Sequence, residues 1–262
     1  YLRTFGVSVG YGKRLSWPDD YFSFYSELSY QLYMMKDWPY MILTDGNSHN
    51  LALNFRLMRS SIDNPIYTRR GSQFTLGLKI TPPYSLIKGT TDAQYAQMSA
   101  TEKYNLLEYH KWSFSGKVFT PLTADSKLVL MARADFGYLG HYNKNVKSPF
   151  ESFYMGGDGM SSYSSYSTEY ISMRGYQSGS LTPYDPATGR NMGYVYNKFT
   201  MELRYPIALE QNATIWALAF LEAGNCFADI KDYNPFNLKR SAGVGVRLFL
   251  PMFGLMGIDW GW

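Results

Sequence analysis

Apolar and polar residues alternate with a period of two along most of this chain. In residues 197–206, Phe199, Met201, Leu203 and Tyr205 alternate with charged or hydroxylated residues. This period places successive side chains on opposite faces of a β-strand. The pattern predicts about ten strands, at residues 4–12, 21–35, 50–58, 72–81, 111–119, 127–138, 197–206, 213–224, 238–250 and 255–262, the last of them incomplete.

The connections between these strands differ in length in a regular way. Short connections at 14–20, 120–126, 207–212 and 251–254 alternate with longer ones, the longest being 138–196, while 60–71 is intermediate. Outer-membrane barrels have short periplasmic turns and long external loops. Strands of roughly 9–12 residues suit a tilted membrane crossing, whereas strands of soluble sandwiches average about 5–6. The fold class predicted is therefore all-β, an antiparallel transmembrane β-barrel of outer-membrane type.

This topology predicts on which side of the membrane each connection lies, and which residues lie at the membrane boundary or in the lumen. The turns at 16–20, 120–126 and 207–212 are expected in the periplasm, and the segments 36–48, 82–108 and 138–196 outside. An aromatic girdle at the membrane boundary is expected from residues near strand ends, namely Tyr11, Trp17, Tyr33, Trp38, Trp112, Tyr138, Tyr205 and Trp260. The polar lumen is expected to contain Glu27, Arg56, Lys79, Lys117, Arg133, Asp135, Glu202, Arg204 and Arg247.

Amino-acid composition limits further the kinds of protein to which the chain can belong. The 24 tyrosines suit positions that are half wet and half apolar. A net charge of +4 without a Lys/Arg-rich run gives no reason to expect a nucleic-acid partner. The single cysteine, Cys226, excludes an internal disulfide framework. No apolar run reaches the ~18–20 residues of a membrane helix. The chain shows no signal peptide and opens on Tyr1 in what already looks like a strand, so it is expected to be a piece of a longer protein.

Catalytic and metal-binding patterns are not found. His49, His110 and His141 fall at the expected outer ends of strands or in an outer loop, without the Ser and carboxylate spacing that a barrel lipase would need. CxxC and HExxH spacings are absent. Glycines such as those in GVSVGYG belong to a strand and are not followed by a helix, which argues against a phosphate loop. The sequence therefore predicts no enzyme, no metal and no cofactor.

Four segments together carry a family resemblance. They are FYMGG at 153–157, SMRGYQ at 172–177, FLEAGN at 220–225 and NLKRSAGVGVRLFLPMFGLMGIDWGW at 237–262. In this order they resemble the barrel of the BamA-type outer-membrane protein insertases and their superfamily. The matching positions are Gly156, Gly157, Arg174, Gly175, Tyr176, Glu222, Gly224, Ser241, Gly243, Gly245, Pro251, Gly254 and Asp259.

The resemblance implies a role for the long segment 138–196. In the family this loop folds back into the lumen, and the arginine at its tip pairs with an acidic residue of the barrel wall. Arg174 is thus expected to meet Glu222, with Gly175 and Tyr176 completing the tip and Gly224 following the acidic residue. Two features depart from the family: Glu222 stands where Asp is usual, and the stretch between FYMGG and MRGY is longer than expected.

The resemblance also implies a function and partners. It implies an assembly factor that folds β-barrel clients and inserts them into the outer membrane of a Gram-negative bacterium through a lateral seam, without a nucleotide. Its implied partners are unfolded barrel clients, accessory BAM-type lipoproteins, periplasmic chaperones and outer-membrane lipid. A TamA-like relative would share nearly all of these motifs. A passive porin or TonB-dependent transporter would share the alternation, but has no need of Arg174 and Glu222.

The family's plan has sixteen strands, preceded by POTRA domains. Counted against it, Tyr1 falls near the sixth strand and Trp262 in the fifteenth. Residues 1–262 are thus expected to form one partial barrel of about ten strands, with the POTRA domains and the first and last strands outside the chain.

Overall fold

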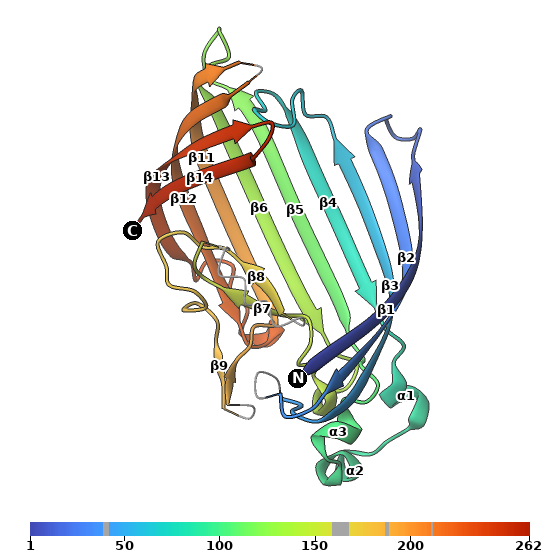
Figure 1. Cartoon of the computed structure of the whole chain (residues 1–262). Coiled ribbons are helices and arrows are strands. Elements are labelled where there is room, and N and C mark those ends of the chain that lie inside the picture. The colour runs from blue at the N-terminus through green and yellow to red at the C-terminus, as the bar shows by residue number, and fades with distance from the viewer. Residues whose placement is uncertain (39–41, 159–167, 187–188, 211) are drawn as a thin grey trace.

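Ten long strands form one antiparallel sheet (Figure 1). The structure is a computed structural model that describes residues 1–38, 42–158, 168–186, 189–210 and 212–262. The sheet order is β1-β2-β3-β4-β5-β6-β11-β12-β13-β14. Its strands are β1 (Leu2–Arg14), β2 (Phe22–Met35), β3 (Gly46–Ser60), β4 (Gly71–Ile80), β5 (His110–Pro121), β6 (Val129–Gly140), β11 (Val195–Leu209), β12 (Thr214–Phe227), β13 (Lys239–Leu250) and β14 (Gly254–Gly261).

The remaining elements lie in the connections. Three short helices, α1 (Tyr84–Lys88), α2 (Asp92–Gln97) and α3 (Ala100–Lys103), follow β4. Two 3₁₀ turns cover Lys144–Val146 and Ile230–Asp232. The long segment between β6 and β11 contains β7 (Ser152–Met155), which pairs in parallel with β8 (Thr168–Ile171), and the small pair β9 (Tyr184–Asp185) and β10 (Arg190–Asn191). None of the described helices is long and apolar enough to cross a membrane.

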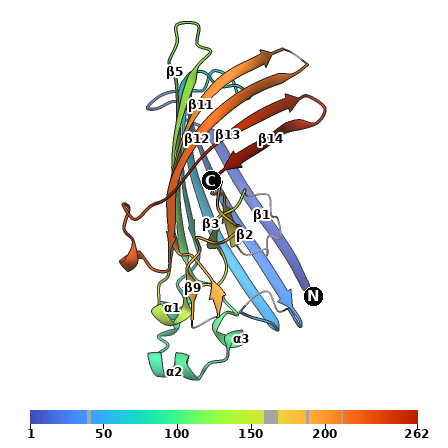
Figure 2. The ribbon, with the colours of Figure 1, turned by 90° about the vertical axis from the view of Figure 1, so that its left-hand side faces the viewer.

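Each of the ten predicted strands is present, and their order in space follows the sequence. Every neighbour in the large sheet is the next long strand along the chain, which is the arrangement of an up-and-down barrel wall. The sheet curves strongly, as Figure 2 shows, and the segment with β7 and β8 lies on its concave side. The short turns gather at one end of the strands, and the helices and the long segment at the other (Figure 1).

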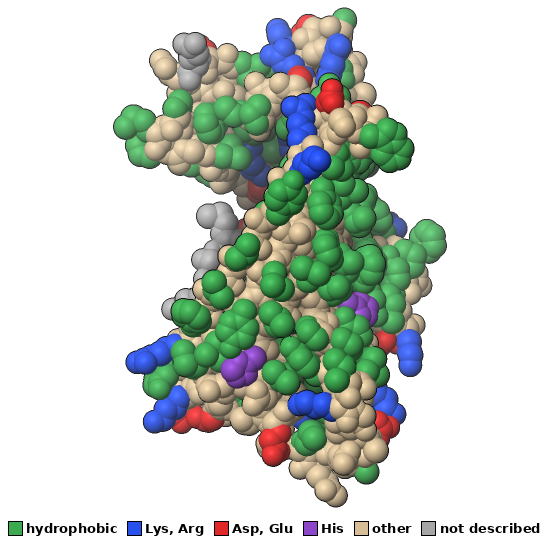
Figure 3. Space-filling model, turned by 90° about the vertical axis from the view of Figure 1, so that its right-hand side faces the viewer, with side chains coloured by type: hydrophobic (Ala, Val, Ile, Leu, Met, Phe, Trp, Pro, Cys, Tyr) green, Lys and Arg blue, Asp and Glu red, His purple; other side chains and the backbone are tan. Residues whose placement is uncertain are grey.

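The two faces of the sheet separate by residue type. On the convex face, large apolar side chains are exposed, including Val9, Leu76, Leu203 and Ile258. Figure 3 shows that hydrophobic side chains cover the middle of this face, with charged residues towards the two ends. The concave face carries the polar partner of each alternating pair, and its lumenal charges are largely paired. Such a distribution is stable when the convex face meets lipid and the concave face meets water and protein.

The aromatic girdle is only partly as predicted. Tyr33 is 2% exposed, and its ring centroid lies 4.9 Å from that of Phe150 in the long segment. Trp38 packs against the same core cluster. The prediction for these two residues was wrong because the long segment folds inward and gives aromatic residues near strand ends an apolar partner inside the barrel.

Leu76 and Thr75 provide a matched test of the faces because they are neighbours on β4 at the same depth. Leu76→Arg places a charge on the exposed apolar face and should cost about 2–4 kcal/mol at mid-membrane. Thr75→Arg faces the lumen and should cost far less. Heat-modifiable gel mobility of the protein assembled in membranes would report folding of each variant. Equal loss of folded protein in both variants would show that the faces are assigned wrongly.

Candidate functional site: the lumenal loop tip and its charged seat

The tip of the long segment is a tight turn over Met173–Tyr176. The Tyr176 amide donates to the Met173 carbonyl at 3.3 Å, and Gly175 has a φ of 84°. A type II turn requires positive φ at its third residue, which favours glycine there. Gly157 fixes this turn from the side: its amide donates to the Tyr176 carbonyl at 3.1 Å, and the Met173 amide donates back to the Gly157 carbonyl at 2.8 Å.

Backbone conformation and steric crowding explain why two glycines precede the turn. Gly156 and Gly157 have φ values of 127° and 81°. A side chain at Gly156 would also collide with the backbone near Gln177. The sequence Gly156-Gly157 is therefore what allows the chain after β7 to approach the tip closely and clamp it.

Arg174 is anchored to Glu222 on β12 by backbone and side chain together. The Arg174 amide donates to Glu222 Oε2 at 2.8 Å, and its Nε and Nη2 donate to Oε1 at 3.0 and 2.8 Å. The Glu222 side chain is 2% exposed and that of Arg174 11%. The contact expected between these two residues is therefore present, with Glu in place of the usual Asp.

Arg174 also contacts carboxylates on two other strands. Its Nη2 donates to Glu202 of β11 at 2.8 Å, and its Nη1 lies 3.6 Å from Asp259 of β14. The guanidinium carbon lies 3.7 Å from the centroid of the Phe220 ring, within range of a cation–π interaction. A planar guanidinium suits this position because it presents donors in several directions and remains charged when buried.

Each of these carboxylates has a second cation. Lys198 Nζ lies 3.0 Å from Glu222, Arg204 Nη2 lies 2.7 Å from Glu202, and Arg247 Nη2 lies 2.7 Å from Asp259. We call these seven residues the charged seat: Arg174, Lys198, Glu202, Arg204, Glu222, Arg247 and Asp259. The seat joins the loop tip to strands β11 to β14, and a buried carboxylate within it is never left without a cation. Such compensation is what makes buried charge tolerable.

The register of the strands creates the seat. Glu222 lies opposite Thr200 on β11 and Ser241 on β13. Gly243 lies opposite Phe220, and Gly245 opposite Asp259. A Cβ at Gly243 would collide with Phe220, and one at Gly245 with Asp259. The glycines of β13 thus leave the volume that the Phe220 ring and the Asp259 carboxylate occupy.

The turn itself lies close to the C-terminal end of the chain. A Cβ on Gly175 would come within 3.1 Å of the Trp262 amide nitrogen and 3.2 Å of Ser241 Cβ, so the small residue permits this approach. The Tyr176 hydroxyl donates to the Arg240 carbonyl at 2.9 Å. Gly224 leaves room in the same way for Met155 of β7. The motif residues from β7, the loop tip, β12 and β13 therefore lie at the loop tip or beside the residues that contact it, while their role in function stays a prediction.

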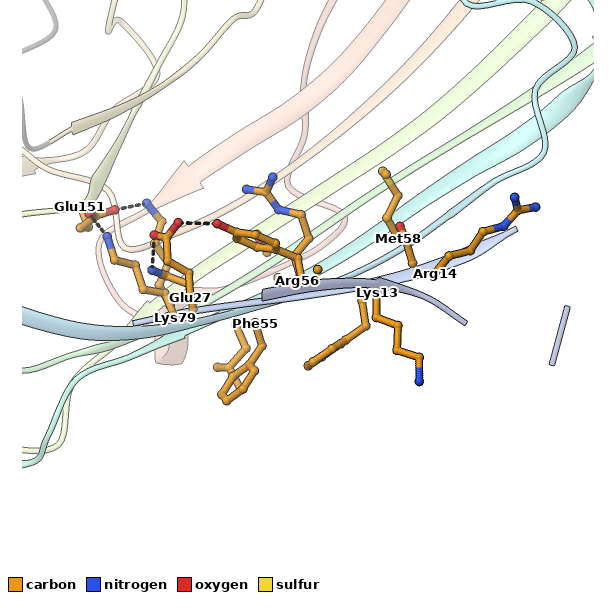
Figure 4. Close-up of a pocket in the computed structure, with 17 residues that line it drawn as sticks. Lys13, Arg14, Glu27, Phe55, Arg56, Met58, Lys79 and Glu151 are labelled. Atoms are coloured by element: carbon orange, nitrogen blue, oxygen red, sulfur yellow. Dashed lines mark hydrogen bonds and ion pairs between the residues drawn. The ribbon is translucent and has the colours of Figure 1, made fainter. Parts of the chain in front are cut away.

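A second ionic anchor holds the same segment against another part of the wall, on β4 and β5. Glu151, just before β7, bridges Lys79 of β4 and Lys111 of β5, the latter at 3.0 Å. Lys111 is also 2.7 Å from Glu169 of β8. Figure 4 shows Lys79 pointing to Glu151, which it contacts directly at one end of a lumenal cavity that Glu27 and Arg56 also line. The volume of this cavity is about 880 Å³. Here the wall supplies the cations and the loop the carboxylates, the reverse of the charged seat.

Glu151 adopts an unusual backbone conformation at this anchor. Its φ of 68° is left-handed, which is uncommon and costly for a residue other than glycine. Burial by itself raises the pKa of Glu151, but Lys111 and Lys79 outweigh that effect and hold it at about 2. The residue is therefore ionised at neutral pH. Lys79 was predicted from the sequence to face the lumen, whereas Glu151 was not predicted as a site residue, since no motif or period marks it.

The three histidines that were considered as catalytic residues lie on different elements of the fold. His49 contacts the Tyr30 hydroxyl on the convex side, His110 lies at the start of β5, and His141 follows β6. Among the described residues, no group of three or more His, Cys, Asp or Glu is placed to hold a metal ion. Much of the extra-long stretch between FYMGG and MRGY, residues 159–167, lies outside the described residues.

Comparison with known proteins decides the family. The model of the Omp85 superfamily domain matches residues 2–262. The chain belongs to the Omp85 superfamily. Its fold resembles that of BamA from Haemophilus ducreyi lacking POTRA domains 1–3, with a TM-score of 0.70 and 16% identity. It also resembles CdiB from Escherichia coli, with a TM-score of 0.50 and 12% identity. No curated protein sequence matches the chain.

The structural matches cover this Omp85 chain completely but only part of each relative. They span 51% of the BamA chain and 45% of the CdiB chain. The chain thus corresponds to about half the length of these solved structures. An Omp85 barrel wall accounts for the sheet order, the apolar convex face and the long segment inside the curve.

The energetic role of the charged seat can be measured with a double-mutant cycle. Removal of one partner from an isolated buried pair costs about 3–5 kcal/mol. Here Glu222 keeps Lys198, and Arg174 keeps Glu202, so each single Ala variant should cost less. The barrel should still assemble, and Arg174→Ala with Glu222→Ala should be non-additive by about 1–3 kcal/mol in denaturant unfolding. Arg174→Lys should rescue poorly, because an ammonium group cannot make the planar two-bond contact.

The matched control for that cycle is the exposed pair Lys144 and Asp92, whose side chains are 71% and 64% exposed. Lys144→Ala should change stability by less than about 1 kcal/mol. Strictly additive effects of the Arg174 and Glu222 substitutions would contradict the existence of a coupled seat.

Proposed function

We propose that this protein is an outer-membrane protein assembly factor that folds β-barrel clients and inserts them into the outer membrane of a Gram-negative bacterium. The observation that carries this proposal is the loop tip held in the lumen by Arg174 and Glu222. Membership of the Omp85 superfamily and the fold shared with BamA support it.

The contents of the lumen favour an assembly factor over a porin. A passive pore needs an open water path, whereas here the segment between β6 and β11 is tied to the wall at two ionic anchors, on β4–β5 and on β11–β14. A segment tied into the lumen at two places narrows such a path. The same segment gives the wall a rigid internal brace, which would keep the wall in shape while another part of the barrel opens.

The proposed mechanism is strand addition. A client strand with unpaired amides and carbonyls would pair with an exposed edge at the seam of the complete barrel, and local thinning of the bilayer would lower the barrier to insertion. No nucleotide is needed, because the client's own hydrogen bonds and buried apolar surface drive the process. Its partners would be unfolded barrel clients, periplasmic chaperones, accessory BAM-type lipoproteins and membrane lipid.

A TamA-like assembly relative is the second candidate, because such a protein would share the motifs from Gly156 to Asp259 that support the first. The two candidates share the barrel chemistry and differ in the domains that precede it. The same experiment below therefore tests the shared activity.

The test uses the full-length protein in liposomes with a urea-unfolded β-barrel client. We expect client folding, followed by protease protection and gel shift, to be faster than in empty liposomes and unaffected by ATP. Arg174→Ala should slow it by at least about tenfold, the effect of roughly 1.4 kcal/mol, while the variant itself remains folded. Lys144→Ala serves as the control and should match the wild type. Client folding no faster than in empty liposomes, together with rapid uptake of small sugars, would identify a pore instead.

A further inference from the structure

A pocket of about 620 Å³ lies outside the barrel, beneath the helical segment that follows β4. Tyr30, His49 and Leu51 of β2 and β3 form its wall, and their side chains belong to the convex, apolar face. Residues between Tyr84 and Glu108 form its cover. The pocket is therefore not part of the lumen and shares no residue with the charged seat or the Glu151 anchor.

The cover is fixed to the sheet by backbone hydrogen bonds. The His49 amide donates to the Asn105 carbonyl at 2.7 Å, and the Leu107 amide donates to the His49 carbonyl at 3.0 Å. These bonds use the part of β3 beyond its pairing with β4, which begins at Leu53. The pocket is thus a built feature of the fold, with a wall and a cover joined at one edge.

Buried polar groups without partners line the inner part of the pocket. Glu108 is 2% exposed, and its Oε2 accepts from the Ser85 amide at 2.6 Å. Its other oxygen, Oε1, has no hydrogen-bond partner among the described residues, and neither has the hydroxyl of Ser85, which is 4% exposed. Because an unsatisfied buried acceptor is destabilising, this arrangement points to a ligand that donates hydrogen bonds.

The rest of the lining adds two lysines, a second carboxylate and aromatic surface. Lys88 and Lys103 line the pocket, and neither has an ion-pair partner among the described residues. Glu102 also lines the pocket, and its Oε2 accepts from the amide and hydroxyl of Ser99, each at 2.8 Å. Tyr30, Tyr84 and Tyr95 supply aromatic rings. Rings beside hydrogen-bond acceptors suit sugar rings, and free ammonium groups suit an anion.

The position of the pocket indicates a ligand that belongs to the membrane. Leu86 and Ile87, directly before Lys88 on α1, are 63% and 73% exposed. An exposed apolar pair beside a lysine is typical of a segment at the membrane boundary, where apolar side chains enter the bilayer and the ammonium remains at the head groups. Figure 3 shows the apolar convex face giving way to charged residues near this end.

We propose that this pocket binds the head group of an anionic glycolipid of the surrounding membrane. Sugar hydroxyls donate to Glu108 Oε1 and exchange hydrogen bonds with Ser85, while the lipid's acidic group lies against Lys88 and Lys103. The acyl chains then follow the apolar wall beyond Leu51. This inference rests on the membrane location contained in the proposed function, but it does not depend on client folding.

The test is native mass spectrometry of the purified full-length protein released from detergent, after incubation with one lipid at a time. The probes are lipid A, which is a phosphorylated sugar lipid, phosphatidylglycerol, which is anionic without a sugar ring, and dodecyl maltoside, which is a sugar without charge. We expect lipid A to be retained at least about tenfold better than either other probe, as two or more hydrogen bonds and an ion pair require.

Two variants separate the contribution of the buried carboxylate from that of the two lysines. Glu108→Gln preserves shape but replaces an ionised acceptor, and should lower lipid A occupancy about tenfold. The double variant Lys88→Gln, Lys103→Gln leaves the buried groups intact and should abolish the preference over dodecyl maltoside. Lys144→Gln, an exposed lysine outside the pocket lining, is the control and should bind as the wild type does.

Equal retention of the three probes, or lipid A occupancy unchanged in both test variants, would overturn the assignment and leave a solvent-filled gap. Failure of the proposed function has a different signature. A protein that retains lipid A but does not accelerate client folding would refute the assembly role and leave the glycolipid site standing.

Discussion

A single arginine that cannot be left unpaired inside the barrel determines how the long loop is placed. Arg174 is 11% exposed, and it is in contact with Glu222, Glu202 and, more distantly, Asp259. Withdrawal of the loop tip would leave a 2%-exposed carboxylate with one cation fewer, and the tight turn without its backbone anchor on Glu222. The path of the segment between β6 and β11, the glycines of β13 and the close approach of Gly175 to Trp262 all follow from this contact.

The second anchor attaches the segment to the wall at a second place, so that the segment can act as a brace between the two. Glu151 ties the start of the same segment to β4 and β5, while Arg174 ties its tip to β11, β12 and β14. Because the two anchors hold different parts of the segment and have opposite polarity, neither can substitute for the other. A brace between two regions of a curved wall resists flattening of the sheet. That property is what a barrel would need if its seam has to open without loss of shape.

The fold could be predicted far better than the contacts within it. Period-two alternation identified the ten strands, because lipid on one face and water on the other impose that period on every strand. Arg174 and Glu222 came from a resemblance, and Glu202 was placed in the lumen without a partner. Glu151 could not be predicted: it is 72 and 40 residues from its two lysines, and no period connects positions so far apart. Tyr33 was assigned to the girdle because the sequence pattern does not reveal an inward-folded loop.

Hydrogen exchange in the unmodified protein tests the central claim, that the loop tip is fixed in the lumen, most directly. The amides of Met173, Arg174 and Gly157 each donate to a partner across the seat or the clamp. We expect them to exchange as slowly as amides in the middle of β12, with the exposed Glu102 region of the outer loop exchanging quickly as an internal reference. Exchange of the 173–176 amides at the rate of that outer loop would show that the tip is free, and would contradict the account.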